Sequence, residues 1–128
     1  MTIIATTLKP GIETTVQDVG RAQWRHFGTP QSGAADRLSF ALTNAAAGNN
    51  WDAPALECAG LGPTLQFKTD TAFAIGGADM AATLNDAPLS RYTPHHAEAG
   101  DTLALHAAKA GLRSYIAVAG GVSGKSDL

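Results

Sequence analysis

The chain has 128 residues, a length typical of a single domain (residues 1–128), and its 11 acidic and 9 basic residues give a formal net charge of −2. Without a basic patch or a long charged run, the sequence lacks the patterns typical of nucleic-acid and anionic-membrane binding. No segment approaches the roughly 20 apolar residues of a membrane-spanning helix. The lone cysteine, Cys58, and an N-terminus without signal-peptide features predict a cytoplasmic protein.

The N-terminal part predicts two short strands and then the main helix. Residues 3–8 and 14–17 are rich in β-branched side chains and are bounded by turn-forming residues. Residues 34–47 are predicted to be helical because Ala and Leu dominate them and Gly48 follows as a stop, with Ser32 or Asp36 as the candidate cap. The apolar stripe predicted to pack against a sheet consists of Leu38, Ala41, Leu42, Ala45 and Ala46.

The C-terminal part reads as a series of short strands separated by turn signals, which predicts a β-barrel or sandwich. The runs are residues 55–58, 64–67, 72–75, 81–84, 102–106 and 114–119. Asn85-Asp86 is a candidate hairpin turn between two of them. The chain ends soon after residues 114–119. Either this run is therefore an exposed edge strand that favours self-association, or the chain is part of a larger protein.

Polar residues gather in the glycine-rich segment between the second strand and the helix. Asp18 and Arg21 either form a local ion pair or present Arg21 to an anionic oxygen, with Asp18 orienting it. Ser32 lacks a nucleophile elbow, so a helix cap or a hydrogen-bond donor to a ligand is favoured over a nucleophile. Glu57, inside an apolar strand, lies either on the solvent face or buried with a partner such as Arg21, and a structural role is favoured.

Other motifs predict no chemistry of their own. Residues 119–126 resemble a relaxed phosphate loop, but the sequence leaves no room for the helix that such a loop requires. His95 and His96 are adjacent and would point to opposite faces of a strand, so we interpret them as exposed loop histidines rather than metal ligands. The aromatic residues near the loop and helix are predicted to be core, with Trp24 and Phe27 as alternative pocket-lining residues; the full set is Trp24, Phe27, Phe40 and Trp51.

Several segments, in the same order along the chain, resemble the biotin-dependent carboxyltransferase family known as allophanate hydrolase subunit 2, which includes the C subunit of 5-oxoprolinase and the carboxyltransferase half of urea carboxylase. The segments are residues 15–21, 28–36, 55–57, 62–67, 76–79 and 115–121, together with Asn44, Gly48 and Asn49. Gln23 departs from the family, which usually has a glycine there, and members are expected to be considerably longer. A complete carboxyltransferase site is therefore not expected from this chain alone.

The resemblance implies a mainly β, partial cyclophilin-like barrel that takes part in ATP-dependent amide hydrolysis or carboxyl transfer together with a homologous partner subunit. Biotin or ATP would act through partner subunits rather than be bound by this chain. The catalytic candidates are Asp18, Arg21, Ser32 and Asp36. The substrate-binding candidates are Gln17, Gly28, Pro30, Gly33 and Glu57, and no metal site is expected. The alternatives are a regulatory protein-binding module that acts on a sensor-kinase inhibitor, as in a bacterial relative, and a truncated fragment without activity.

Overall fold

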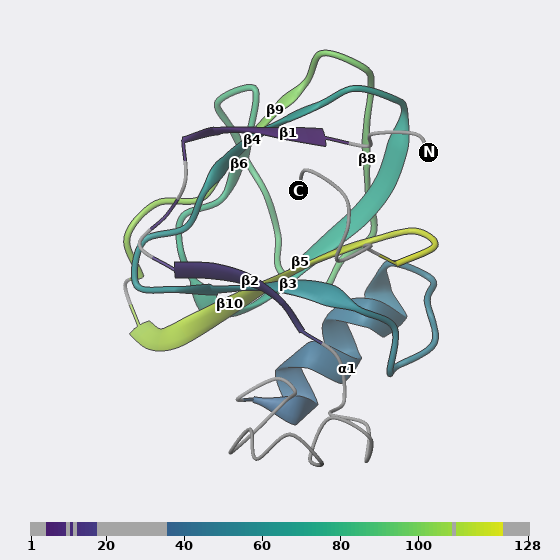
Figure 1. The fold of residues 1–128 in the computed structure, drawn as a ribbon, viewed down its shortest axis with the longest axis vertical. Helices are drawn as coiled ribbons and strands as arrows, with labels where there is room; N and C mark the ends of the chain where they lie inside the picture. The colour runs from purple at the N-terminus through teal and green to yellow at the C-terminus, as the bar shows by residue number, and fades with distance from the viewer. Residues whose placement is uncertain (1–4, 10, 12, 18–35, 109, 122–128) are drawn as a thin grey trace, which may run out of the picture.

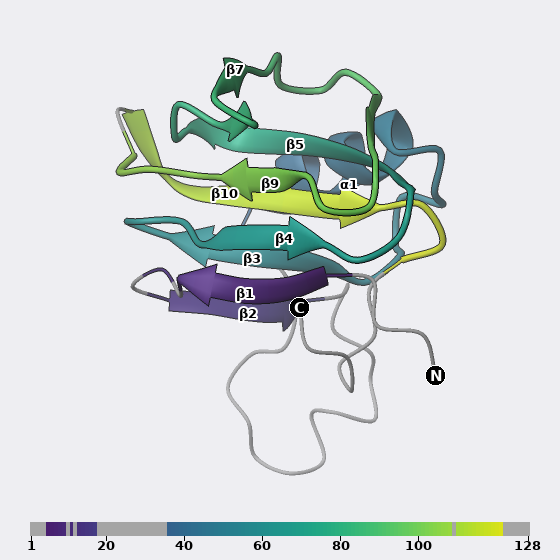
Figure 2. The same ribbon diagram turned by 90° about the horizontal axis from the view of Figure 1, so that it is seen from above.

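Two antiparallel five-stranded sheets form the body of the protein, and one helix covers the second sheet (Figures 1 and 2). The computed structural model describes residues 5–9, 11, 13–17, 36–108 and 110–121. The first sheet has the order β1 (Ala5–Lys9), β4 (Thr64–Phe67), β9 (Thr102–Ala104), β6 (Thr83–Leu84) and β7 (Ala87–Pro88). The second has the order β2 (Glu13–Gln17), β3 (Ala55–Ala59), β10 (Ala110–Val118), β5 (Thr71–Asp79) and β8 (His95–Ala97).

The predicted fold class is confirmed: the protein is mainly β, and the two sheets make a partial barrel that does not close. In the described part of the chain the one helix is α1 (Arg37–Ala46), which lies within the predicted span of 34–47. Figure 1 shows α1 lying across the outer face of the second sheet, and its contacts are with β5 and β10. Asn85 and Asp86 both have positive φ angles, of 50° and 70°, and they form the predicted hairpin turn between β6 and β7.

Alternation along each strand divides the apolar side chains between two cores. Leu56 and Cys58 of β3 and Ile116 and Val118 of β10 point between the sheets, into the main core. Their neighbours on the same strands point the other way, toward α1. The core beneath the helix consists of Phe40, Ala47, Ala55, Ala74, Tyr115 and Ala117.

The predicted apolar stripe of the helix is wrong for its two leucines, although Ala46 packs against the core beneath the helix. Leu38 and Leu42 are 69% and 47% exposed, whereas the face that packs on the sheet carries Phe40, Thr43 and Asn44. Burying Thr43 and Asn44 leaves no polar group without a partner, because both side chains are hydrogen-bonded. Thr43 Oγ1 donates to the Ser39 carbonyl at 2.7 Å, and the bonds of Asn44 are described next. Small residues on the second sheet let this face of α1 approach the sheet closely.

Two asparagines hold the C-terminal end of α1 in place: Asn44 bonds to the loop that follows the helix, and Asn49 bonds to the end of β10. Asn44 Nδ2 donates to the carbonyls of Trp51 and Ala53, at 3.2 and 2.7 Å. Asn49 Nδ2 donates to the Val118 carbonyl at 2.7 Å, and Asn49 Oδ1 accepts from the Gly120 amide at 2.9 Å. These bonds give a structural role to the Asn44 and Asn49 positions of the family resemblance.

Three further expectations need correction. β10 is not an edge strand, because it pairs with β3 on one side and β5 on the other. His95 and His96 lie in strand β8 rather than in a loop; His95 packs on Phe73 with ring centroids 5.6 Å apart. Trp51 is 59% exposed and so is not core, whereas Phe40 is buried as predicted. Trp24 and Phe27 lie outside the described residues.

Within the described residues, no helix is long and apolar enough to cross a membrane.

Candidate functional site

The ends of β2 and α1 bracket the segment in which the sequence places most of the candidate residues. Gln17 is the last residue of β2 and pairs in register with Ala55 of β3. Asp36 immediately precedes α1, and its amide is bonded to a side chain of β10. Six of the candidates fall between these two points and lie outside the described residues: Asp18, Arg21, Gly28, Pro30, Ser32 and Gly33.

Asp36 is the N-cap of α1, one of the two caps that the sequence suggested. Its carboxylate accepts a hydrogen bond from the Ser39 amide at 3.0 Å and another from the Ser39 hydroxyl at 2.7 Å. These bonds stabilise the charged form, so they hold the pKa of Asp36 below its usual value of 3.8. The carboxylate is therefore an anion at neutral pH, committed to the helix terminus.

The hydroxyl of Tyr115 joins Asp36 to Glu57. It accepts a hydrogen bond from the backbone amide of Asp36 at 3.0 Å and donates to Glu57 Oε2 at 2.7 Å. Tyr115 is fully buried, and Glu57 is only 6% exposed. Burial, together with the hydrogen bond to Glu57, raises the pKa of Tyr115, so the phenol stays protonated and remains a donor.

Strand register brings Glu57 and Tyr115 together. The two residues face each other across the β3–β10 pair, and alternation turns both toward the helix side of the sheet. Arg113, two residues before Tyr115 on β10, places its guanidinium nitrogen NH1 3.4 Å from Glu57 Oε1. Glu57 is thus buried with partners, as one of the two sequence-based alternatives required, and its described partners are Tyr115 and Arg113.

Sequence reasoning missed Tyr115 and Arg113 as members of this site. The available signal was the alternation along residues 113–117, where Arg113 and Tyr115 share a face and lie one strand away from Glu57. Finding it required knowing that β10 is adjacent to β3, which single-sequence patterns do not reveal.

A second branch of hydrogen bonds runs from Asp36 toward β5. Ser39 Oγ, which donates to Asp36, accepts from the Tyr92 hydroxyl at 3.3 Å, and that hydroxyl accepts from the Gly77 amide at 2.8 Å. Tyr92 has a φ of 60°, a left-handed conformation that costs a non-glycine residue about 1–2 kcal/mol. Its amide donates to the Ile75 carbonyl at 2.7 Å, which helps to hold this strained residue in place.

In the described part of the chain, this arrangement is suited to positioning the start of α1. The described residues hold no cluster of three His, Cys, Asp or Glu side chains able to bind a metal. Burial raises the pKa of the Cys58 thiol to about 12, which excludes a thiolate nucleophile there. The network instead fixes the start of α1 against the second sheet.

Comparison with known proteins identifies the family to which the chain belongs. The model of the carboxyltransferase domain, subdomain A and B, matches residues 27–127. Urea amidolyase of Lachancea kluyveri is 42% identical over 114 residues, covering 88% of this chain and 6% of that protein. The C subunit of 5-oxoprolinase from Escherichia coli is 39% identical over 115 residues, covering 90% of this chain and 37% of that protein.

The structural comparison agrees. The crystal structure of Kluyveromyces lactis urea carboxylase matches 94% of this chain with a TM-score of 0.89 and 38% sequence identity. The match covers 11% of that protein. The chain thus spans only a minor part of each of these proteins, from 6% to 37% of their length.

Proposed function

Because the chain belongs to the family of the carboxyltransferase domain, subdomain A and B, we propose that it is a component of an ATP-dependent amide-processing or carboxyl-transfer system that works with a homologous partner subunit. The observation that carries this proposal is the combined match to urea amidolyase, urea carboxylase and the 5-oxoprolinase C subunit over nearly the whole chain. If it is an enzyme, it is a subunit of an amidohydrolase or of a biotin-dependent carboxyltransferase.

In this proposal the segment from Gln17 to Asp36 lines a cleft for a small amide. Arg21, oriented by Asp18, and the backbone amides near Gly33 would stabilise a developing oxyanion. Ser32 would donate a hydrogen bond to the substrate, while Gly28 and Pro30 would shape the loop. Asp36 and Glu57 support it from the folded body, because both are tied to Tyr115.

We propose that ATP and biotin act through partner subunits rather than being bound by this chain alone, and we derive no step through them. In support, the N-terminus of α1 is capped by the Asp36 carboxylate, whose charge disfavours a phosphate at that position.

A partner surface is available on the exposed face of α1. Leu38 and Leu42 are one helical turn apart and exposed, and the large apolar side chain of Trp51 is exposed in the loop that follows the helix. We propose that the homologous subunit, or a second copy of this chain in a homo-oligomer, covers this face. Pairing through β10, the basis of the sequence expectation, is excluded by its central place in the sheet.

The proposed compartment is the cytoplasm, since Cys58 is the only cysteine of the sequence and its thiol is free and buried.

The test is to co-express the chain with a homologous partner subunit, purify any complex, and measure ADP release with urea and with 5-oxoproline as amides. A complex that turns over either amide with ATP supports the proposal. A stable complex without turnover would support the regulatory binding module, and the absence of both complex and turnover would support the inactive fragment.

Comparing Arg21→Ala with Glu57→Ala separates the loop from the folded body. An exposed ion pair contributes at most about 1 kcal/mol, so Arg21→Ala should leave Tm almost unchanged while weakening partner or substrate binding. Glu57→Ala should lower Tm first, because it leaves Tyr115 and Arg113 without their buried acceptor. Unfolding by Arg21→Ala with a silent Glu57→Ala would show that the two roles are reversed.

A further inference from the structure

The second half of β5 has an edge that no described strand covers. β8 pairs with Thr71, Ala72 and Phe73 only, whereas β10 runs along the other edge of β5 as far as Asp79. From residue 74 to residue 79, β5 therefore has a described neighbour strand on one side alone. An uncovered edge presents backbone amides and carbonyls that can pair with another chain.

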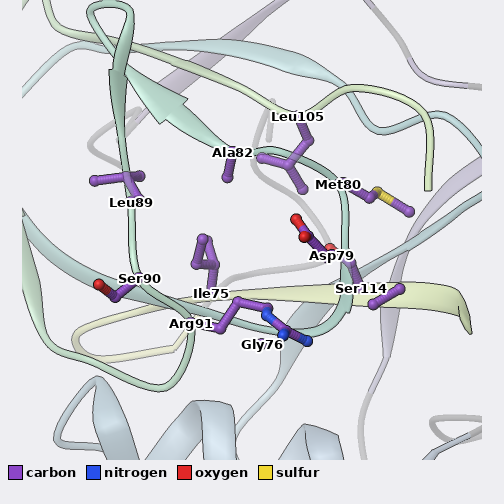
Figure 3. A pocket seen from close by; sticks show the side chains of 11 residues that line it. Ile75, Gly76, Asp79, Met80, Ala82, Leu89, Ser90, Arg91, Leu105 and Ser114 are labelled. Carbon is purple, nitrogen blue, oxygen red and sulfur yellow. The ribbon is translucent and has the colours of Figure 1, made fainter. Parts of the chain in front are cut away.

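Two consecutive residues, Arg91 and Tyr92, bind this edge in place of a strand. They lie in the segment between β7 and β8, and Figure 3 shows the Arg91 side chain beside Gly76 of β5. The Tyr92 amide donates to the Ile75 carbonyl at 2.7 Å. The Gly77 amide donates to the Tyr92 hydroxyl at 2.8 Å, and Arg91 NH1 donates to the Gly77 carbonyl at 2.6 Å. One backbone amide and two side chains thus satisfy three backbone groups of β5.

Tyr92 takes up this position in a strained conformation. Its φ of 60° is left-handed, which is unfavourable for a residue that carries a side chain. Such a residue persists only where its surroundings hold it. The Tyr92 ring lies directly over Gly76, where a Cβ atom would be 2.6 Å from the ring carbon Cε1. His95 Nε2 also donates to the Ser90 carbonyl at 2.8 Å, which fixes the chain just before Arg91. Strain in a surface residue that binds a strand edge indicates a role for that contact itself.

We infer that Arg91 and Tyr92 form an edge cap, an autoinhibitory contact that keeps β5 of one chain from pairing with β5 of a second copy. Every copy carries the same edge, and antiparallel pairing about a two-fold axis makes such an edge complementary to itself. With the axis at Gly76, Ile75 of each copy faces Gly77 of the other. Three of the four backbone groups that each such pair would use are those that the edge cap binds.

The first test removes the edge cap. The double variant Arg91→Ala/Tyr92→Phe loses both side-chain bonds to Gly77 and keeps the ring over Gly76. Without these bonds the strained backbone of Tyr92 relaxes, which also frees the Ile75 carbonyl. We expect the mean mass from multi-angle light scattering to exceed that of the unsubstituted chain and to rise with concentration. Arg91→Ala alone removes one exposed bond, so it keeps the fold and should give a smaller rise in the same direction.

Hydrogen exchange by NMR locates the pairing. In the unsubstituted chain the Gly77 amide should be protected equally at every concentration, because its acceptor belongs to the same chain. In the double variant this amide should exchange at least about tenfold faster when dilute, and it should regain protection as the concentration rises. Samples that mix labelled and unlabelled copies should show contacts between residue 75 of one copy and residue 77 of the other.

Ser39→Ala is the matched control. It takes one hydrogen bond from Asp36 and one from Tyr92, so it lowers Tm, but it leaves both side-chain bonds to Gly77. Its mean mass should equal that of the unsubstituted chain, which separates loss of the edge cap from general destabilisation.

The inference is overturned if the double variant and Arg91→Ala keep the mass of the unsubstituted chain at every concentration. It is equally overturned if the Gly77 amide of the double variant stays unprotected when concentrated, or if Ser39→Ala associates as strongly as the double variant. These readouts concern one edge of β5 and need neither a partner subunit nor amide turnover, so they are independent of the proposed function.

Discussion

Tyr115 is the residue on which the candidate site depends most, because its hydroxyl serves two buried groups from different elements. It accepts a hydrogen bond from the backbone amide of Asp36, just before α1, and donates one to a carboxylate oxygen of Glu57. The hydroxyl and the Glu57 carboxylate are buried together, so solvent cannot replace this bond at little cost. A single hydroxyl thus holds the helix terminus against the β3–β10 pair.

Tyr115→Phe is therefore expected to lower the free energy of unfolding by about 1.5–3 kcal/mol, the range for a hydrogen bond to a charged group. The matched control is Tyr92→Phe, which removes a hydroxyl at an exposed position and should cost about 1 kcal/mol or less. Urea denaturation followed by far-UV circular dichroism measures both. Equal stability of the two variants would show that the buried Tyr115 hydroxyl contributes no more to the free energy of unfolding than the exposed hydroxyl of Tyr92.

Asp36 makes stability depend on acid pH. Its pKa is lowered in the folded protein by hydrogen bonds from Ser39, so the contribution is present above the unfolded pKa and is lost as the pH falls through the folded pKa. The exposed carboxylate of Asp101 acts with the same sign, because the Glu98 amide and Asn85 lower its pKa.

Asp36→Asn should flatten the fall of Tm below about pH 4, because the amide has no charge to lose. Asp101→Asn should flatten the same region, and the double variant should combine both effects because the two sites share no partner. Thermal unfolding of the four proteins across the acid range tests this. A curve for Asp36→Asn that parallels the unsubstituted chain would exclude Asp36 as a source of the pH dependence.

At the scale of elements, the packing of α1 on β5 depends on the absence of a side chain at Gly76. A Cβ atom there would collide with Thr43 Oγ1 and with the ring of Tyr92. The helix therefore sits closer to the sheet than a larger residue would allow. This close approach also explains how the face bearing Thr43 and Asn44 packs inward while Leu38 and Leu42 point out.

Gly76→Ala should lower the free energy of unfolding by about 1–3 kcal/mol through overpacking. Thr43→Ala removes one of the two colliding groups, so the double variant Gly76→Ala/Thr43→Ala should be more stable than the sum of the two single effects predicts. Gly48→Ala serves as the control: nothing lies near its Cβ position, and its cost comes only from the positive φ of 84°. Strict additivity in urea unfolding would contradict the steric account.

Local sequence patterns predicted which elements exist better than which faces they bury. The span of α1, its Asp36 cap and the Asn85-Asp86 turn follow from residues close in sequence, where propensity and capping act. The buried face of α1 was mispredicted because hydrophobic periodicity counts Leu38 and Leu42 as core and cannot see that Thr43 and Asn44 find partners in the loop after the helix and within it. β7 and β8 were missed because neither lies in an apolar run: β7 ends at Pro88, and β8 carries His95 and His96.

At the scale of the whole molecule, the order of the strands within each sheet could not be predicted from the sequence. A long apolar run near the end of the chain gives the same pattern whether the strand is an exposed edge or a centre. The structure places β10 between β3 and β5, which also creates the site, since only this neighbourhood brings Arg113 and Tyr115 to Glu57. Among the described strands the edges are β1 and β7 in the first sheet and β2 and β8 in the second, and Figure 2 shows β1 and β2 along one side of the molecule.

The central place of β10 predicts a specific pattern of amide exchange. Where β10 has neighbours on both sides all its amides are bonded, so every amide from Ser114 to Ile116 should be protected. In β2, which pairs only with β3 among the described strands, protection should alternate from one residue to the next. Residue-resolved hydrogen exchange by NMR distinguishes the two patterns. Alternating protection along residues 114–116 would mean that β10 is an edge in solution. If the missing neighbour were β3, Arg113 and Tyr115 would also be separated from Glu57.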